Sequence, residues 1–122
     1  MGSRIVIQLK RVYETPSRKD GLRVLVDRLW PRGLTKQRAA VDLWLKELAP
    51  STELRKWFGH EPDKWKEFQT RYRKEIREKT ELVHDLQKRA AKDTVTLVYG
   101  ARDEERNQAV VLKQIIEYGS KK

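Results

Sequence analysis

Cysteine is absent from this chain of 122 residues. Its absence excludes disulfide bonds, thiol catalysis and thiolate metal sites. Only two histidines are present, far apart and without a His-Glu-x-x-His spacing, so we expect no metal site. Neither Gly-x-x-x-x-Gly-Lys-Ser/Thr nor Gly-x-Gly-x-x-Gly occurs, which excludes the standard nucleotide-phosphate loops.

Long apolar runs are also missing, and none approaches the roughly 20 residues that a membrane span requires. No cationic start is followed by an apolar core and a small-residue cleavage site, which is the pattern of a secretory signal peptide. We therefore expect a cytoplasmic protein without a cofactor and without a membrane partner. The length predicts one domain over residues 1–122, and no feature of the sequence specifies an oligomeric state.

Positive charge is abundant. The chain has 28 Lys and Arg against 18 Asp and Glu, so its formal net charge is +10. Such an excess favours anionic partners by long-range attraction. Two explanations stay open: a surface that binds nucleic acid, or a charged surface that only keeps a small protein soluble, because basic residues alternate with acidic ones.

Three short runs of β-branched and apolar residues predict strands. They cover residues 5–9 with an extension to Val12, 22–27 and 94–99. Apolar residues at helical spacing, with caps and stops at the ends of each stretch, predict helices. The predicted helices are 35–50 with Thr35 as N-cap, 52–59, a long helix from Pro62 to Ala90 with a break near Thr80, and 103–118 with Asp103 as N-cap.

Strands that alternate with helical segments are typical of an α/β fold. We predict a small, mostly parallel sheet of three to four strands packed with four to five helices. The connection between the first two strands is short and contains no helix, which suits either an antiparallel pair or an edge strand.

Polar turns follow two of the predicted strands. One turn is Asp27-Arg28-Leu29-Trp30-Pro31-Arg32-Gly33, and the other is Gly100-Ala101-Arg102-Asp103. Since open α/β sheets bind ligands outside the carboxyl ends of their strands, we expect the two turns to form one arginine-rich site. The guanidinium groups of Arg28, Arg32 and Arg102 would then bind a phosphate or carboxylate through paired hydrogen bonds. The alternative is a structural clamp in which Arg28 pairs with Asp27 or Asp103.

Asp27 is the candidate catalytic acid or base. Burial would raise the pKa of this carboxyl and adjacent arginines would lower it. With two arginines close in sequence, we expect Asp27 to be ionised and to orient a neighbouring group, and direct proton transfer is the alternative role.

Further ligand contacts are expected from aromatic and polar residues near chain breaks. Trp30 and Trp57 border Pro31 and Gly59 and are candidate pocket walls, whereas Trp44 and Trp65 follow helical apolar stripes typical of a core. The full predicted ligand-binding set is Arg28, Trp30, Arg32, Gly33, Arg55, Trp57, His60, Arg102, Asp103 and Asn107.

Several blocks of the sequence resemble one known family. The blocks are residues 11–13, 24–33, 42–46, 49–51, 54–60 and 96–112. They are similar to the YeaO-like branch of the DUF488 family, which is bacterial and archaeal and has no established biochemical role. The resemblance covers nearly the whole chain and implies a compact α/β domain in the cytoplasm. The positions that it selects are Asp27, Arg28, Trp30, Pro31, Arg32, Gly33, Arg55, Gly59, Asp103 and Asn107.

The resemblance also reveals a departure. Many relatives carry histidine where this chain has Gln108, and some carry it where this chain has Arg106. If those histidines transfer protons in the relatives, this protein has lost that chemistry. The departure favours ligand binding over catalysis.

The preferred hypothesis is an arginine-rich pocket that binds a phosphate- or carboxylate-bearing small molecule, and whether it also acts on that molecule stays open. The first alternative is a nucleic-acid-binding module that uses the basic helix faces around Arg38, Arg55 and Arg71. The second is an interaction protein whose arginine clamp is only structural.

Overall fold

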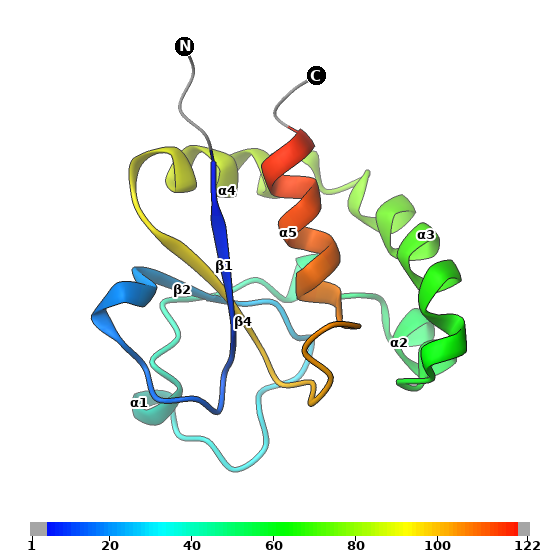
Figure 1. The fold of residues 1–122 in the computed structure, drawn as a ribbon, viewed down its shortest axis with the longest axis horizontal. Coiled ribbons are helices and arrows are strands. Elements are labelled where there is room, and N and C mark those ends of the chain that lie inside the picture. The colour runs from blue at the N-terminus through cyan, green and yellow to red at the C-terminus, as the bar shows by residue number, and fades with distance from the viewer. Residues whose placement is uncertain (1–4, 120–122) are drawn as a thin grey trace.

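The structure is a computed structural model that describes residues 5–119. This part of the chain forms an α/β fold with one four-stranded sheet and five α-helices (Figure 1). The strands are β1 (Ile7–Arg11), β2 (Leu22–Leu25), β3 (Leu43–Trp44) and β4 (Val95–Tyr99). The α-helices are α1 (Lys36–Ala39), α2 (Thr52–Phe58), α3 (Trp65–Ile76), α4 (Thr80–Lys92) and α5 (Gln108–Gly119). Short 3-10 helices are η1 (Arg18–Asp20), η2 (Lys46–Leu48) and η3 (Pro62–Lys64).

The sheet has the order β1-β4-β2-β3, and every neighbouring pair of strands is parallel. The last strand in sequence, β4, lies between β1 and β2, with Leu97 opposite both Leu9 and Val24. All five residues of β4 are buried, as expected for a parallel strand covered on both faces. The predicted α/β class and mostly parallel sheet are confirmed, and β1 is an edge strand. The antiparallel alternative for the first two strands is wrong, because β4 separates them.

The helices between β3 and β4 follow their local sequence signals. The predicted helix 52–59 corresponds to α2, whose N-cap Ser51 accepts a hydrogen bond from the Leu54 N–H at 3.1 Å. Gly59 ends α2 in the left-handed conformation, with φ of 53°. The predicted break near Thr80 is confirmed, since α3 ends at Ile76 and α4 begins at Thr80. No helix within residues 5–119 has the length and apolar character needed to cross a membrane.

The prediction of one helix over residues 35–50 is wrong beyond its first turn. Thr35 caps α1 as expected, but the helix ends at Ala39, and Ala40 adopts the left-handed conformation with φ of 50°. The guanidinium group of Arg23 binds the carbonyl oxygens of Ala39 and Ala40. The backbone of Asp42 then pairs with that of Arg23, and the chain enters the sheet as β3. Contacts with β2 therefore outweigh the helical spacing of the apolar residues in this segment.

The two faces of the sheet carry different cores. Alternate strand residues such as Ile7, Val24 and Leu97 belong to the larger core, which is completed by α2, α3, α4 and α5. On the opposite face, a smaller cluster of Val12, Leu25, Ala39 and Val98 is covered by partly buried apolar side chains of the 30–44 segment. Figure 1 shows α3, α4 and α5 gathered together and α1 apart from them. Side-chain alternation along each strand produces this division.

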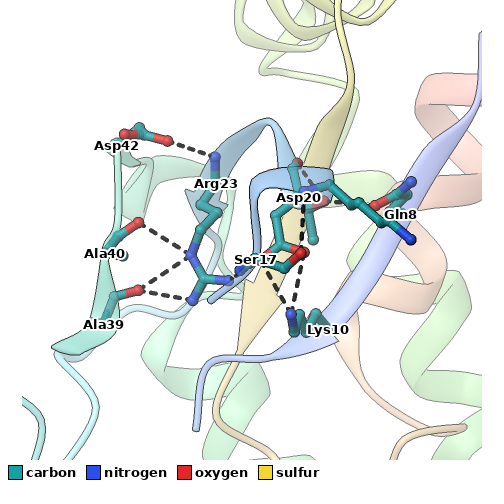
Figure 2. A network of polar contacts seen from close by, with 10 residues as sticks. Gln8, Lys10, Ser17, Asp20, Arg23, Ala39, Ala40 and Asp42 are labelled. Carbon is teal, nitrogen blue, oxygen red and sulfur yellow. Dashed lines mark hydrogen bonds and ion pairs between the residues drawn. The ribbon is translucent and has the colours of Figure 1, made fainter. Parts of the chain in front are cut away.

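A buried polar network shares the second face with the smaller cluster (Figure 2). Asp20 and Arg23 form a buried ion pair, with 2.6 Å between Asp20 Oδ2 and Arg23 Nη1. Lys10 Nζ and the Ser17 N–H also donate to the Asp20 carboxylate. The Thr96 hydroxyl of β4 donates to the Asp20 carbonyl oxygen at 2.6 Å. These bonds fix the connection from β1 to β2 where it passes over β4, and they leave no unpaired charge inside.

We expect Asp20→Ala to lower the free energy of unfolding by about 3 to 5 kcal/mol at pH 7, because it leaves the Arg23 guanidinium buried without its partner. Urea denaturation monitored by tryptophan fluorescence measures this loss. Asp85→Ala is the matched control. It breaks an exposed ion pair with Arg89 and should cost less than about 1 kcal/mol.

The same variant has a defined pH dependence. Burial opposes ionisation of Asp20, but hydrogen bonds from Ser17, Lys10 and Arg23 outweigh it and hold the pKa below the ordinary value of 3.8. A carboxyl whose pKa is lower in the folded than in the unfolded state stabilises the fold at any pH above its unfolded-state pKa. This stabilisation disappears as the pH falls through the folded-state pKa. The difference in unfolding free energy between wild type and Asp20→Ala should therefore become smaller only at acidic pH. If this difference stays constant down to the pH at which the protein unfolds in acid, the pKa of Asp20 is not lowered in the folded protein.

Candidate functional site

The turns that follow β2 and β4 lie side by side at the carboxyl edge of the sheet. The Val26 N–H donates to the Val98 carbonyl at 3.2 Å, which continues the parallel pairing one residue beyond β2. One step further, the Gly100 N–H donates to Asp27 Oδ2 at 2.8 Å. The structure thus brings the two predicted turns together, as strand order and direction require.

A pocket of about 320 Å³ opens at this edge. Its lining comes from Tyr13 after β1, from the 27–32 turn, from Pro50 before α2, from α2 and His60 after it, from Phe68 of α3, and from the 100–108 segment. Among the lining residues that the structure describes, four arginines and one histidine face the single carboxylate of Asp27, so the arginines give the lining an excess of positive charge. These basic residues are Arg28, Arg32, Arg55, His60 and Arg106.

Asp27 is held by hydrogen bonds on every side. Its Oδ2 accepts from the Gly100 N–H, and its Oδ1 accepts from Gln108 Nε2 at 2.6 Å. Its carbonyl oxygen accepts from the indole N–H of Trp44 at 2.8 Å. Because Gln108 is the first residue of α5, the carboxylate also lies beside the positive end of that helix. The arrangement orients Asp27 and fixes the ends of β2, β3 and β4 relative to α5.

Gly100 is required by the closeness of Asp27. A Cβ atom at position 100 would lie 2.9 Å from Asp27 Oδ2, inside the ordinary contact distance. Glycine therefore permits the backbone N–H of the β4 turn to reach the carboxylate.

The pKa of Asp27 is raised above the ordinary value of 3.8, chiefly because the carboxyl is largely buried. The hydrogen bonds from Gly100 and Gln108 and the charges of Arg55 and His60 oppose this rise without cancelling it. The sequence suggested that the neighbouring arginines would lower this pKa. Burial is the stronger of the two opposing effects, and the hydrogen bonds of Arg28 go to the carbonyl oxygens of Pro50 and Ala49 and not to this carboxylate.

Arg28 is a clamp, but it acts on carbonyl oxygens and not on carboxylates. Its Nε donates to the Pro50 carbonyl at 3.0 Å and its Nη2 to the Ala49 carbonyl at 3.3 Å. Arg11, at the end of β1, holds the other turn in the same way through the carbonyl oxygens of Gly100 and Ala101. The two guanidinium groups fix loops that border the pocket.

The remaining arginines differ in their placement. Arg32 and Arg55 are exposed and line the pocket, and within residues 5–119 no hydrogen bond or ion pair engages either guanidinium group. Arg106 also lines it and forms an ion pair of 3.2 Å with Asp103. Arg102 is exposed and does not line the pocket. The predicted arginine trio is therefore not gathered in one hollow, and Arg55 and Arg106 lie where Arg102 was expected.

Of the other predicted site residues, Trp57 and Gly33 do not line the pocket and Trp30 does. Arg71 and Lys64 lie over the indole ring of Trp57, 4.2 and 5.2 Å from its centroid. Gly33 turns the chain with a φ of 83°. Trp30 does line the pocket, and its indole N–H donates to the Leu34 carbonyl at 2.7 Å.

Asp103 is not the N-cap of the last helix, which corrects the predicted start of that helix. Its Oδ1 accepts from the N–H groups of Glu105 and Arg106 and caps a separate turn. The helix begins five residues later at Gln108, where the buried side chain of Asn107 accepts from the Val110 N–H at 3.1 Å. Asn107 therefore acts as the cap and does not line the pocket.

Sequence reasoning left several pocket residues out of its set. Tyr13, Phe58 and Phe68 supply aromatic lining, and Gln108 binds Asp27. Arg106 and Gln108 carried a signal as the positions where relatives have histidine, and Tyr13 and Phe58 lie in the blocks 11–13 and 54–60 that resemble the family. Phe68 followed only the apolar spacing of a helix. Within residues 5–119 the structure has no group of three or more His, Cys, Asp or Glu placed to hold a metal ion.

The fold and the pocket define a small α/β protein with a hollow lined by arginine and aromatic side chains at the carboxyl ends of its parallel strands. Residues 6–122 match a family model described as the inactive DUF488-N3 subclade. The chain belongs to the DUF488 family. No solved structure gives a significant match.

Two relatives are similar over most of their length. An uncharacterized protein of Escherichia coli, YeaO, is 44% identical over 106 residues, which span 87% of this chain and 92% of the relative. An uncharacterized protein of Mycobacterium tuberculosis, Rv3073c, is 41% identical over 110 residues, which span 90% of this chain and 92% of the relative.

The raised pKa of Asp27 gives a test by stability. A carboxyl whose folded-state pKa exceeds the unfolded value binds more protons when folded, so wild type should lose stability as the pH rises from about 4 through the folded value. Asp27→Asn lacks this proton and should lose less stability than wild type over the same range. Urea denaturation at several pH values between 4 and 7 measures the difference.

The control for this experiment is Asp63→Asn, which changes an exposed carboxyl outside the pocket. Its unfolding free energy should follow that of wild type across the range. If the unfolding free energies of Asp27→Asn and wild type change in parallel with pH, the pKa of the Asp27 carboxyl is not raised in the folded protein.

Proposed function

We propose that this protein binds a small anionic molecule, bearing a phosphate or a carboxylate, in the pocket at the ends of β2 and β4. The observation that carries the proposal is the charge of the lining, which has four arginines and one aspartate. Both oxygens of Asp27 already accept hydrogen bonds from Gly100 and Gln108, and its one charge offsets only part of the charge of the four arginines. A concave site with excess positive charge concentrates anions.

Arg32 and Arg55 are the proposed direct contacts with the anion. Their guanidinium groups have no other hydrogen-bonding or ion-pair partner within residues 5–119, and a fork of N–H donors matches the oxygens of phosphate and carboxylate. Arg106 lines the same pocket and would add positive charge on binding, and His60 lines it as a further polar side chain. Arg28 would act indirectly by holding the 49–50 turn in place.

Binding is favoured over catalysis. Within residues 5–119, Asp27 is the only carboxylate that lines the pocket, and its hydrogen bonds with Gly100 and Gln108 support an orienting role. The description of the matching family model as inactive supports the same conclusion.

We expect the double variant Arg32→Ala/Arg55→Ala to lose binding of an inorganic anion while it keeps the wild-type fold, because both side chains are exposed. Inorganic phosphate, pyrophosphate and citrate serve as probes in thermal-shift and calorimetric titrations at low salt. A ligand at 100 times its Kd stabilises the folded state by about 2.7 kcal/mol, which is readily seen as a shift in Tm.

Arg18→Ala/Arg77→Ala is the matched control, since it removes two exposed arginines that do not line the pocket. It should retain the anion-induced shift apart from a small effect of net charge. Equal loss in both double variants, or an unchanged shift in the pocket variant, would refute a specific anion site.

Nucleic acid is the alternative partner, suggested by the net charge of +10. Ion pairs along the helices count against it, because Arg71 pairs with Glu67 and Arg89 pairs with Asp85. A nucleic-acid-binding surface would give an affinity for labelled RNA or DNA that falls steeply between about 50 and 200 mM salt. We expect no such salt-dependent complex in fluorescence anisotropy, and a steep dependence would establish the alternative.

A further inference from the structure

The apolar part of the pocket indicates what the bound anion is attached to. Beside its arginines, the lining contains the aromatic rings of Tyr13, Trp30, Phe58 and Phe68. An inorganic anion has no apolar surface that could pack against these rings. Sites for organic ligands typically combine a mainly apolar wall with a few charged groups. The volume of about 320 Å³ also exceeds what a bare phosphate fills.

Tyr13 is a fixed but exposed ring at this pocket. Its hydroxyl donates to the Arg32 carbonyl at 2.9 Å, and the guanidinium group of Arg11 lies 5.2 Å from its ring centroid. The residue is nevertheless 42% exposed. A ring held in place before binding loses little conformational freedom when a ligand stacks on it.

Leu29 is the second exposed apolar side chain at the pocket, with 61% of its surface accessible. Within residues 5–119, four large hydrophobic residues are exposed, and two of them, Tyr13 and Leu29, line this pocket. Leaving such surface in water is unfavourable, so covering it with a ligand would contribute to binding.

We infer that the ligand carries its phosphate on a molecule with a flat aromatic or heteroaromatic ring, as a nucleoside monophosphate does. This inference rests on the proposed anion site. Arg32 and Arg55 bind the phosphate, and the ring packs against Tyr13 and Leu29. The site differs from a glycine-rich phosphate loop because side chains, and not a row of backbone N–H groups, supply the donors.

Three probes separate the ring from the anion: adenosine 5′-monophosphate, ribose 5-phosphate and adenosine, each titrated into the protein by calorimetry. Adenosine monophosphate should bind about tenfold or more tightly than ribose 5-phosphate, which is the effect expected from stacking one base. Adenosine should bind far more weakly than the monophosphate. Arg32→Ala/Arg55→Ala should weaken binding of both phosphates.

Substitutions in the apolar wall should weaken only the contribution of the ligand's ring to the binding affinity. Leu29→Ser should lower the affinity for the monophosphate by several-fold to tenfold and leave that for ribose 5-phosphate unchanged. Tyr13→Phe and Tyr13→Leu both lose the hydrogen bond to the Arg32 carbonyl, so the difference between them measures the ring alone. Tyr13→Leu should bind the monophosphate several-fold to tenfold more weakly than Tyr13→Phe, and the two variants should bind ribose 5-phosphate equally. Val6→Ser, which changes an exposed apolar residue outside this pocket, should bind all probes like wild type.

The outcomes distinguish the two proposals. Equal affinity for the monophosphate and ribose 5-phosphate would overturn the ring inference and leave the anion site intact. Equal affinity for adenosine and the monophosphate would overturn the anion site. Absence of binding by every probe, together with no response to inorganic phosphate, pyrophosphate or citrate, would overturn both.

Discussion

Asp27 connects the ends of β2, β3 and β4 with the start of α5 at the edge of the sheet where the pocket opens. The residue follows β2. Its carboxylate accepts hydrogen bonds from Gly100, directly after β4, and from Gln108, the first residue of α5, and its backbone carbonyl accepts one from Trp44 of β3. Parallel strands deliver their carboxyl ends to one edge, and this residue locks those ends in register. The burial that raises its pKa is a consequence of the same central position. The pocket could not keep its shape if this side chain turned outward.

Arginine serves two purposes around this edge. Arg11 and Arg28 each direct a guanidinium fork at two successive carbonyl oxygens, which satisfies acceptors that the turns would otherwise leave unpaired. Arg32 and Arg55 make no comparable bonds within residues 5–119 and leave their charge facing the hollow. The first pair makes the loops rigid, and the second pair makes the hollow positive. A rigid, charged hollow beside exposed aromatic surface is the physical basis for proposing a binding role.

Sequence-based prediction succeeded where the signal is local. The apolar strands, the caps of α1 and α2, the stop at Gly59 and the break before Thr80 each depend on a few neighbouring residues. It failed for β3, because Arg23 reaches from β2 to the carbonyl oxygens that end α1 and redirects the chain into the sheet. It also misplaced the start of α5, since Asp103 and Asn107 are both good caps and only one of them begins the helix.

The sequence by itself determined the fold class, the positive charge and the meeting of the turns after β2 and β4, because strand patterns and the geometry of parallel sheets fix these features. Only the tertiary structure decided which side chains line the pocket. Arg28 turns to carbonyl oxygens more than twenty residues away, while Tyr13 and Phe68 approach from opposite parts of the chain. The direction of a long side chain depends on the partners that folding places near it, and such partners leave no mark in the local sequence.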